Sequence, residues 1–73
     1  MELRATNTVR ETLDQAKQAE KGVSLHLRNG MTVSGRIGEV AAHQVVICEL
    51  TGKEFYDALV LIEDISVVEV RAR

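Results

Sequence analysis

The sequence predicts a small, mainly β domain in which an N-terminal helix precedes a five-stranded, strongly bent antiparallel sheet that forms a small barrel. Apolar residues first recur at helical spacing and then, after Gly22, alternate with a period of two. Gly35 and Gly38 interrupt the second strand pattern, as is typical where a sheet bends sharply. The chain has 73 residues, which is the size of a single domain, 1–73.

The helix is predicted at about residues 8–20, where apolar residues recur at i, i+4 and i+7 starting from Val9. Thr8 and Glu11 have the spacing of a capping box, which marks the first turn. Gly22, preceded by lysines, is typical of a residue that ends a helix. Because the apolar stripe is narrow, we expect the helix to lie against the sheet.

A hairpin of two strands is predicted to follow the helix. Apolar and polar residues alternate over residues 23–28 and again over 31–37. Between them lies Asn29-Gly30, the dipeptide that best suits the positive φ angles of a two-residue turn. The barrel is therefore predicted to span about residues 23–71.

Three more strand patterns complete the predicted sheet, at residues 44–50, about 54–62 and 65–70. No proline interrupts them. Phe55 and Tyr56 are the only aromatic residues and are adjacent, so a strand would turn one toward the core and the other outward. The last two strands would be open edges, which a small barrel covers by pairing with another subunit.

The composition excludes several classes of protein. With 45% hydrophobic and 27% charged residues, the chain is typical of a globular protein rather than a disordered one. The longest apolar run, 58–62, is far shorter than the ~20 residues of a membrane span, and the N-terminus lacks the apolar segment of a secretory signal. We therefore expect a cytoplasmic protein that does not associate with membranes.

Neither a disulfide nor a metal ion is expected to stabilise this small domain. The single cysteine, Cys48, lies in an apolar strand pattern and is predicted to be a small core residue rather than a reactive thiol. His26 and His43 have no second cysteine with which to complete a zinc site. No cofactor and no catalytic constellation are indicated, so an enzyme is not expected. Oligomerisation remains as the means of stabilisation.

Two segments resemble the Sm-like family of proteins, and within it the bacterial Hfq branch. Residues 23–30 read Val-Ser-Leu-His-Leu-Arg-Asn-Gly and are followed by Gly35 and Ile37. This is similar to the Hfq pattern Val-Ser-Ile-Tyr-Leu-x-Asn-Gly followed by Gly-x-Ile. Residues 63–68 read Glu-Asp-Ile-Ser-Val-Val, similar to His-Ala-Ile-Ser-Thr-Val-Val in Hfq. The resemblance implies the Sm-like small barrel.

The resemblance also implies a ring of six or seven copies of the chain. In this family the fourth strand of each subunit pairs with the fifth strand of the next. Those strands would be residues 58–62 and 65–70 here. Two different apolar edges on one subunit agree with such a head-to-tail contact.

The resemblance further indicates which residues would line the pore of the ring. They are Ala42, His43, Glu63 and Asp64. The lysine and histidine with which Hfq holds uridine-rich RNA fall here on Ile62 and Glu63, and carboxylates repeated around a narrow channel repel phosphate. His43 has the alternative of being an ordinary turn residue. Glu63 and Asp64 have the alternatives of a polar turn and of a carboxylate ring that binds cations or a basic peptide.

The opposite face of the ring would carry any RNA that the chain binds. His26 occupies the position at which Hfq stacks purines on an aromatic residue, and it is predicted to be either a base platform or a solvated surface residue. Because the net charge of −2 repels a polyanion, binding of RNA would need a local basic patch. Arg28 and Arg36 are the basic residues near this strand pair, and they have two alternatives: to contact phosphates, or to pair with Glu49 and Glu54. The predicted contact residues are His26, Arg28, Met31, Thr32, Ser34 and Arg36.

Two functions therefore compete. The first is a non-catalytic, Sm-like ring that binds single-stranded RNA through the His26 face rather than through the pore. The second is a ring that binds a protein partner or serves as a structural module and has lost RNA binding. The missing pore motif and the negative charge favour the second function, whereas the family resemblance favours the first.

Overall fold

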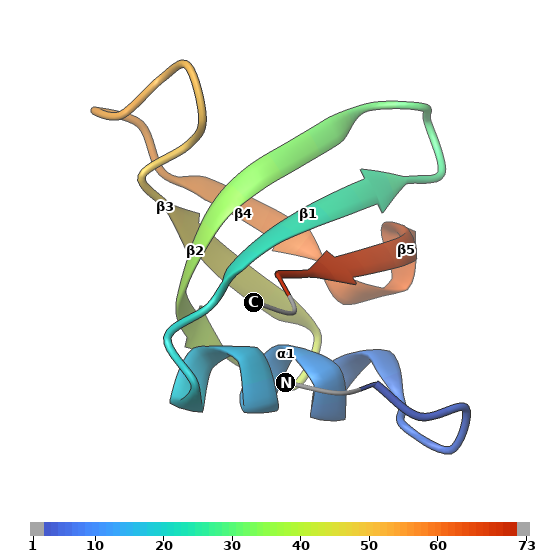
Figure 1. Cartoon of the computed structure of the whole chain (residues 1–73). Helices are drawn as coiled ribbons and strands as arrows, with labels where there is room; N and C mark the ends of the chain where they lie inside the picture. Colours follow the sequence, from blue (N-terminus) through green and yellow to red (C-terminus); the bar gives the residue numbers. More distant parts are fainter. Residues whose placement is uncertain (1–2, 72–73) are drawn as a thin grey trace.

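The computed structural model describes residues 3–71 and places one α-helix before five strands. The elements are α1 (Val9–Gln18), β1 (Gly22–Leu27), β2 (Thr32–Val40), β3 (Gln44–Cys48), β4 (Ala58–Leu61), the 3-10 helix η1 (Ile62–Asp64) and β5 (Ile65–Val70). The strands form one bent antiparallel sheet in the order β4-β3-β2-β1-β5, with α1 below it in Figure 1. The predicted fold class is confirmed, and β4 and β5 are the edges of the sheet.

Helix α1 begins as the sequence predicts. The Thr8 hydroxyl accepts a hydrogen bond from the Glu11 amide (3.1 Å), and the Glu11 carboxylate accepts one from the Thr8 amide (3.4 Å). This capping box satisfies amide groups that the first turn leaves unpaired. Leu13 and Ala16 are fully buried and belong to the core.

The end of the helix differs from the prediction. The last helical residue is Gln18, and Glu20, rather than a glycine, adopts the left-handed conformation with a φ of 54°. The Lys21 amide then donates to the Ala16 carbonyl (3.0 Å), which closes the helix end. Gly22 does not end the helix, because it is already the first residue of β1.

The hairpin between β1 and β2 has a three-residue loop rather than the predicted two-residue turn. The Gly30 amide donates to the Leu27 carbonyl (3.0 Å), and the Leu27 amide donates to the Met31 carbonyl (2.9 Å). Gly30 has a positive φ of 90°, whereas Asn29 does not have a positive φ. A turn followed by one left-handed glycine is the common three-residue solution for a hairpin.

The core is formed by α1 and the inward side chains of β1, β3, β4 and β5. Its buried apolar residues are Leu13, Ala16, Val23, Leu25, Val45, Ile47, Val60 and Ile65. Strand β1 contributes alternate residues to the core, as its period of two predicts. Within residues 3–71, no helix combines the length and apolar character needed to cross a membrane.

The two glycines of β2 permit the sheet to bend, as predicted. A Cβ atom at Gly35 would lie 2.5 Å from the Cys48 carbonyl oxygen, and one at Gly38 would lie 2.6 Å from the Cys48 Sγ. The pairing of β2 with β3 also shifts between Ile37 and Glu39. Strand β3 therefore passes too close to β2 for a side chain at Gly35, whereas a side chain at Gly38 would have to displace the Cys48 thiol.

The fourth strand is shorter than predicted. It has only four residues, and the preceding residues 49–57 form the β3–β4 loop, which projects from the sheet (Figure 1). A first turn, in which the Lys53 amide donates to the Leu50 carbonyl (2.8 Å), precedes the expected strand. A second turn, in which the Tyr56 amide donates to the Lys53 carbonyl (2.9 Å), replaces the start of that strand. Phe55 is 100% exposed and Tyr56 is 64% exposed, so the prediction that one of them enters the core is wrong.

Candidate functional site

The candidate site is the outer face of β1, β2 and β5, where the outward side chains of three strands meet. Strand pairing sets His26 opposite Thr32, and Ser24 opposite Ser34. On the other side of β1, Ser24 lies opposite Glu69 of β5. Because outward residues of paired strands share one face of a sheet, these five polar side chains lie together, beside the exposed side chain of Val67, which pairs with His26 on β5. We call the surface formed by these five side chains the His26 face.

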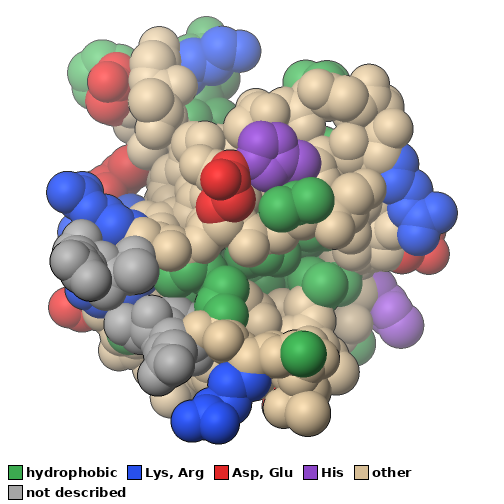
Figure 2. Space-filling view, turned by 45° about the vertical axis from the view of Figure 1, so that its right-hand side comes forward, with side chains coloured by type: hydrophobic (Ala, Val, Ile, Leu, Met, Phe, Trp, Pro, Cys, Tyr) green, Lys and Arg blue, Asp and Glu red, His purple; other side chains and the backbone are tan. Residues whose placement is uncertain are grey.

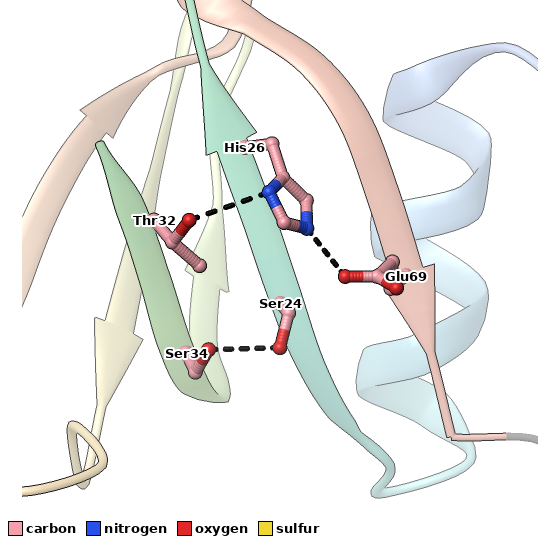
Figure 3. Close-up of polar contacts among 5 residues, drawn as sticks. All are labelled: Ser24, His26, Thr32, Ser34 and Glu69. Carbon is pink, nitrogen blue, oxygen red and sulfur yellow. Dashed lines mark hydrogen bonds and ion pairs between the residues drawn. The ribbon is translucent and has the colours of Figure 1, made fainter. Parts of the chain in front are cut away.

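Hydrogen bonds connect the side chains of the His26 face (Figure 3). The His26 Nε2 atom contacts a Glu69 carboxylate oxygen, and the His26 Nδ1 atom lies 3.3 Å from the Thr32 hydroxyl. The hydroxyls of Ser24 and Ser34 lie 2.8 Å apart. A carboxylate at Nε2 requires a proton on that nitrogen, and the Thr32 hydroxyl can donate to Nδ1 when the ring is neutral. The imidazole is therefore held from both sides.

The surroundings of the fixed imidazole both favour and oppose contact with nucleic acid. The His26 side chain is 41% exposed, which leaves ring surface on which a base can stack. The Glu69 side chain is 63% exposed and brings a negative charge to the same place. Figure 2 shows a histidine and an acidic side chain side by side in the middle of one face. A phosphate directly above the histidine would be repelled, so a stacked nucleotide would have to direct its phosphate away from Glu69.

The structure divides the predicted RNA-contact residues into three groups. His26, Thr32 and Ser34 lie together on the His26 face. Arg28 and Met31 belong to the loop between β1 and β2, where both are exposed. The third group is Arg36 alone, at the other end of the strand pair, so the three groups do not form one basic surface.

Arg36, the last of these residues, lies at the other end of the β1–β2 pair, opposite Gly22. Its guanidinium is 3.5 Å from the Glu49 carboxylate. The alternative in which Arg36 pairs with Glu49 is therefore confirmed. Both side chains are more than half exposed, at 61% and 67%, so water screens this ion pair.

Three of the four predicted pore residues do lie together. Ala42, His43 and Glu63 line a hollow of about 420 Å³ with Leu61 and Ile62. The Ile62 amide donates to the His43 carbonyl (2.9 Å), which fastens η1 to the turn between β2 and β3. His43 lies in that turn, as predicted. The resemblance thus identified neighbouring residues that lie about twenty positions apart in the chain.

Asp64 lies apart from that hollow. It is half-buried, and its carbonyl oxygen accepts a hydrogen bond from the Arg28 amide (2.8 Å). Its backbone therefore supports the loop between β1 and β2. This contact does not involve the Asp64 carboxylate.

A second hollow, which we call the outer groove, adjoins the His26 face. It has a volume of about 490 Å³ and runs across the start of β1, the middle of β2 and the end of β5, between Gly22, Ser34, Arg36, Glu69 and Val70. No sequence pattern predicts it, because its walls come from segments that are distant in the chain. Glu69 was missed for the same reason, since it lies 43 positions from His26.

The thiol of Cys48 is not arranged for reactivity. Partial burial raises its pKa, and the nearby carboxylates of Asp57 and Glu49 raise it further. A raised pKa keeps the thiol protonated, which makes it a poor nucleophile. Within residues 3–71, no three His, Cys, Asp or Glu side chains gather closely enough to hold a metal ion.

No family model matches the chain, and a search of the curated proteins finds no match.

Proposed function

We propose that the chain is a non-catalytic, Sm-like protein that assembles head to tail into a homo-oligomeric ring of six or seven copies. The observation that carries this proposal is the pair of unmatched sheet edges, β4 and β5. Apolar side chains accompany both edges: Leu59 (63% exposed) and Leu61 (46%) on β4, and Val67 (50%) on β5. Open edges with exposed apolar side chains favour pairing with another chain.

The two edges differ, and this favours a ring over a simple dimer. A contact between β4 of one copy and β5 of the next leaves one β4 and one β5 still open. Addition of copies then continues until the rotation per subunit closes the ring. The resemblance of residues 23–30 and 63–68 to Hfq supports closure at six or seven copies.

Two charge substitutions test the head-to-tail contact. Leu59→Lys places a charge on the β4 edge, and Val67→Lys places one on the β5 edge. Val67 is chosen because its neighbour Val68 packs against the core. Native mass spectrometry of the wild type at micromolar concentration should find a ring, and each variant alone should be monomeric.

Mixing the two variants is the stricter measurement. Leu59→Lys retains an intact β5 edge, and Val67→Lys retains an intact β4 edge. A head-to-tail interface therefore predicts a heterodimer with one copy of each variant. A symmetric interface between identical edges predicts no such complex, and a monomeric wild type would overturn the proposal entirely.

Binding of purine-rich single-stranded RNA on the His26 face is a second candidate function. The observation that favours it is the half-exposed imidazole, fixed by Thr32 and Glu69 on an open sheet surface. Fluorescence anisotropy with oligo-A and oligo-U at two salt concentrations tests it. If neither oligonucleotide binds better than a non-specific polyanion, a ring that binds a protein or serves as a structural module becomes the better assignment.

A further inference from the structure

The β3–β4 loop exposes both aromatic side chains of the chain. Phe55 is 100% exposed and Tyr56 is 64% exposed, and no other Phe, Tyr or Trp is present. Figure 2 shows hydrophobic side chains on a part of the molecule that stands clear of the body, where Figure 1 places this loop. A buried aromatic residue removes about 150–250 Å² from water, so both rings would gain from a cover.

The antiparallel sheet determines where this loop would go in an assembly. Every strand pair within the chain is antiparallel. If β4 continues the sheet in the same way, its first residue, Ala58, lies beside Val70, the last residue of the neighbour's β5. The residues that precede Ala58 then pass beyond Val70. The outer groove of the neighbour begins at that point, since Val70 forms part of its wall.

We propose that the β3–β4 loop is an assembly arm, in which Phe55 and Tyr56 pack into the outer groove of the next copy. This inference rests on the proposed head-to-tail assembly. The groove has a volume of about 490 Å³, and Arg36, whose side chain is 61% exposed, lines it and can place its guanidinium against the face of an aromatic ring. An aromatic side chain fits a hollow of this size.

The floor of the groove is left bare at Gly22. A Cβ atom there would meet only the Gly35 carbonyl oxygen, at 3.7 Å, which is an ordinary contact. The fold therefore does not require a glycine at this position. A bare floor instead gives an incoming ring closer access to the backbone.

The β4–β5 contact alone buries too little surface for a stable interface, so a further contact is needed. Strand β4 has four residues and spans only about 13 Å. Stable interfaces bury about 1,200–2,000 Å² in total, which one short strand pair does not provide. Two aromatic side chains would add on the order of 300–500 Å² from the arm alone. The copy whose β5 pairs with β4 is also the copy whose outer groove lies within reach of the loop. The occupant of the groove is therefore the loop of a second copy of this chain.

The first experiment alters the arm and the groove separately. The double variant Phe55→Ser/Tyr56→Ser should raise the subunit dissociation constant roughly tenfold or more, as measured by sedimentation equilibrium. Gly22→Val fills the groove from the receiving side and should have a similar effect, while circular dichroism shows an intact fold. Met31→Ser is the matched control, because Met31 is 59% exposed but lies at the other end of β1.

The second experiment locates the arm directly. The photoreactive analogue p-benzoylphenylalanine at position 55 should crosslink to the tryptic peptide 22–28 of another copy, as identified in mixtures of isotopically labelled and unlabelled protein. A crosslink confined to the same copy would overturn the proposal. So would a serine double variant that assembles as tightly as the wild type, although the ring itself would then stand. A wild type that is monomeric would instead overturn the assembly on which the arm depends.

Discussion

The His26 face differs from the region formed by the β3–β4 loop and the β4 edge. The polar side chains of the His26 face find partners within one copy of the chain, whereas the apolar side chains of the other region do not. On the His26 face, the imidazole contacts both Thr32 and Glu69. In the loop and along the edge, Phe55 and Leu59 remain exposed. The polar groups of the first region bond to each other within one copy, whereas the apolar side chains of the second region stay exposed to water.

This difference ranks the two candidate functions. Polar groups that already bond to each other must exchange those bonds for bonds to a ligand, so the net gain on binding is small. Exposed apolar side chains gain free energy whenever water is removed from them. Assembly through the β4 and β5 edges therefore has stronger physical support than ligand binding on the His26 face.

The largest effect is expected if the His26 face binds RNA after all. A stacked base contributes about 1–3 kcal/mol, and repetition around a ring multiplies weak contacts. His26→Ala should then remove most of the affinity for oligo-A. Glu69→Gln should instead strengthen binding, because it removes a negative charge beside the stacked base while keeping the size of the side chain. Anisotropy titrations of the two variants and the wild type measure both changes.

Two controls accompany the titrations with oligo-A. Arg28→Ala should flatten the salt dependence without changing base preference, if Arg28 contacts a phosphate. If the resemblance to Hfq correctly places Ile62 and Glu63 at the lysine and histidine of its uridine site, oligo-U should bind at ~10⁻⁴ M or weaker. Equal binding of oligo-A by the wild type and His26→Ala would remove the case for a base platform. The side chains of the His26 face would then bond to each other without binding RNA.

The next largest effect is expected at the bend of the sheet, which is packed within one copy of the chain. Gly35→Ala should lower the free energy of unfolding by about 1–3 kcal/mol, because the new methyl group would overlap the Cys48 carbonyl oxygen, 2.5 Å away. Gly22→Ala is the matched control and should cost nothing, since its methyl group meets only an oxygen at 3.7 Å.

Urea unfolding measures both glycine variants, and Leu59→Lys is the suitable background because assembly would otherwise stabilise the folded state. Equal unfolding midpoints for Gly35→Ala and Gly22→Ala would contradict the close approach of β2 and β3.

Local patterns in the sequence predicted most of the fold. The capping box at Thr8 and the alternation of β1 depend on residues close together in the chain, and both are confirmed. The predicted crowding at Gly35 is also confirmed, although the crowding atoms belong to β3. The start of β4 was missed because residues 54–57 have the composition of a strand, while the turns around Lys53 depend on backbone hydrogen bonds. Sequence propensity does not include such bonds.

The candidate site was less predictable than the fold. His26, Thr32 and Ser34 were recognised because they follow one hairpin, in which pairing is local. Glu69 was not recognised, because its contact with His26 requires β1 to pair with β5 in one particular register. Registers between strands distant in sequence are set by the whole core rather than by a local pattern.

A smaller effect concerns the thiol at the base of the β3–β4 loop. Partial burial and the neighbouring Asp57 carboxylate raise the pKa of Cys48, so the thiolate forms at higher pH than in a free cysteine. The rate of alkylation by iodoacetamide, followed by mass spectrometry, should therefore rise with pH later than that of a cysteine peptide. Asp57→Asn should move the curve back toward lower pH. A thiol that reacts like the free peptide would mean that the loop opens away from Cys48.

The smallest effect is expected at the connection between α1 and β1, where one copy is folded but strained. Glu20 has a φ of 54°, a conformation that costs an L-residue about 1–2 kcal/mol, whereas glycine adopts it freely. Glu20→Gly should raise the free energy of unfolding by about 0.5–1 kcal/mol, because the greater freedom of glycine in the unfolded chain offsets part of the gain. Glu20→Ala is the control that removes the same carboxylate but keeps the Cβ atom, and it should leave stability nearly unchanged. If both variants gain equally in urea unfolding, the strain at this connection is electrostatic rather than conformational, and the left-handed residue is not what limits the stability of the helix end.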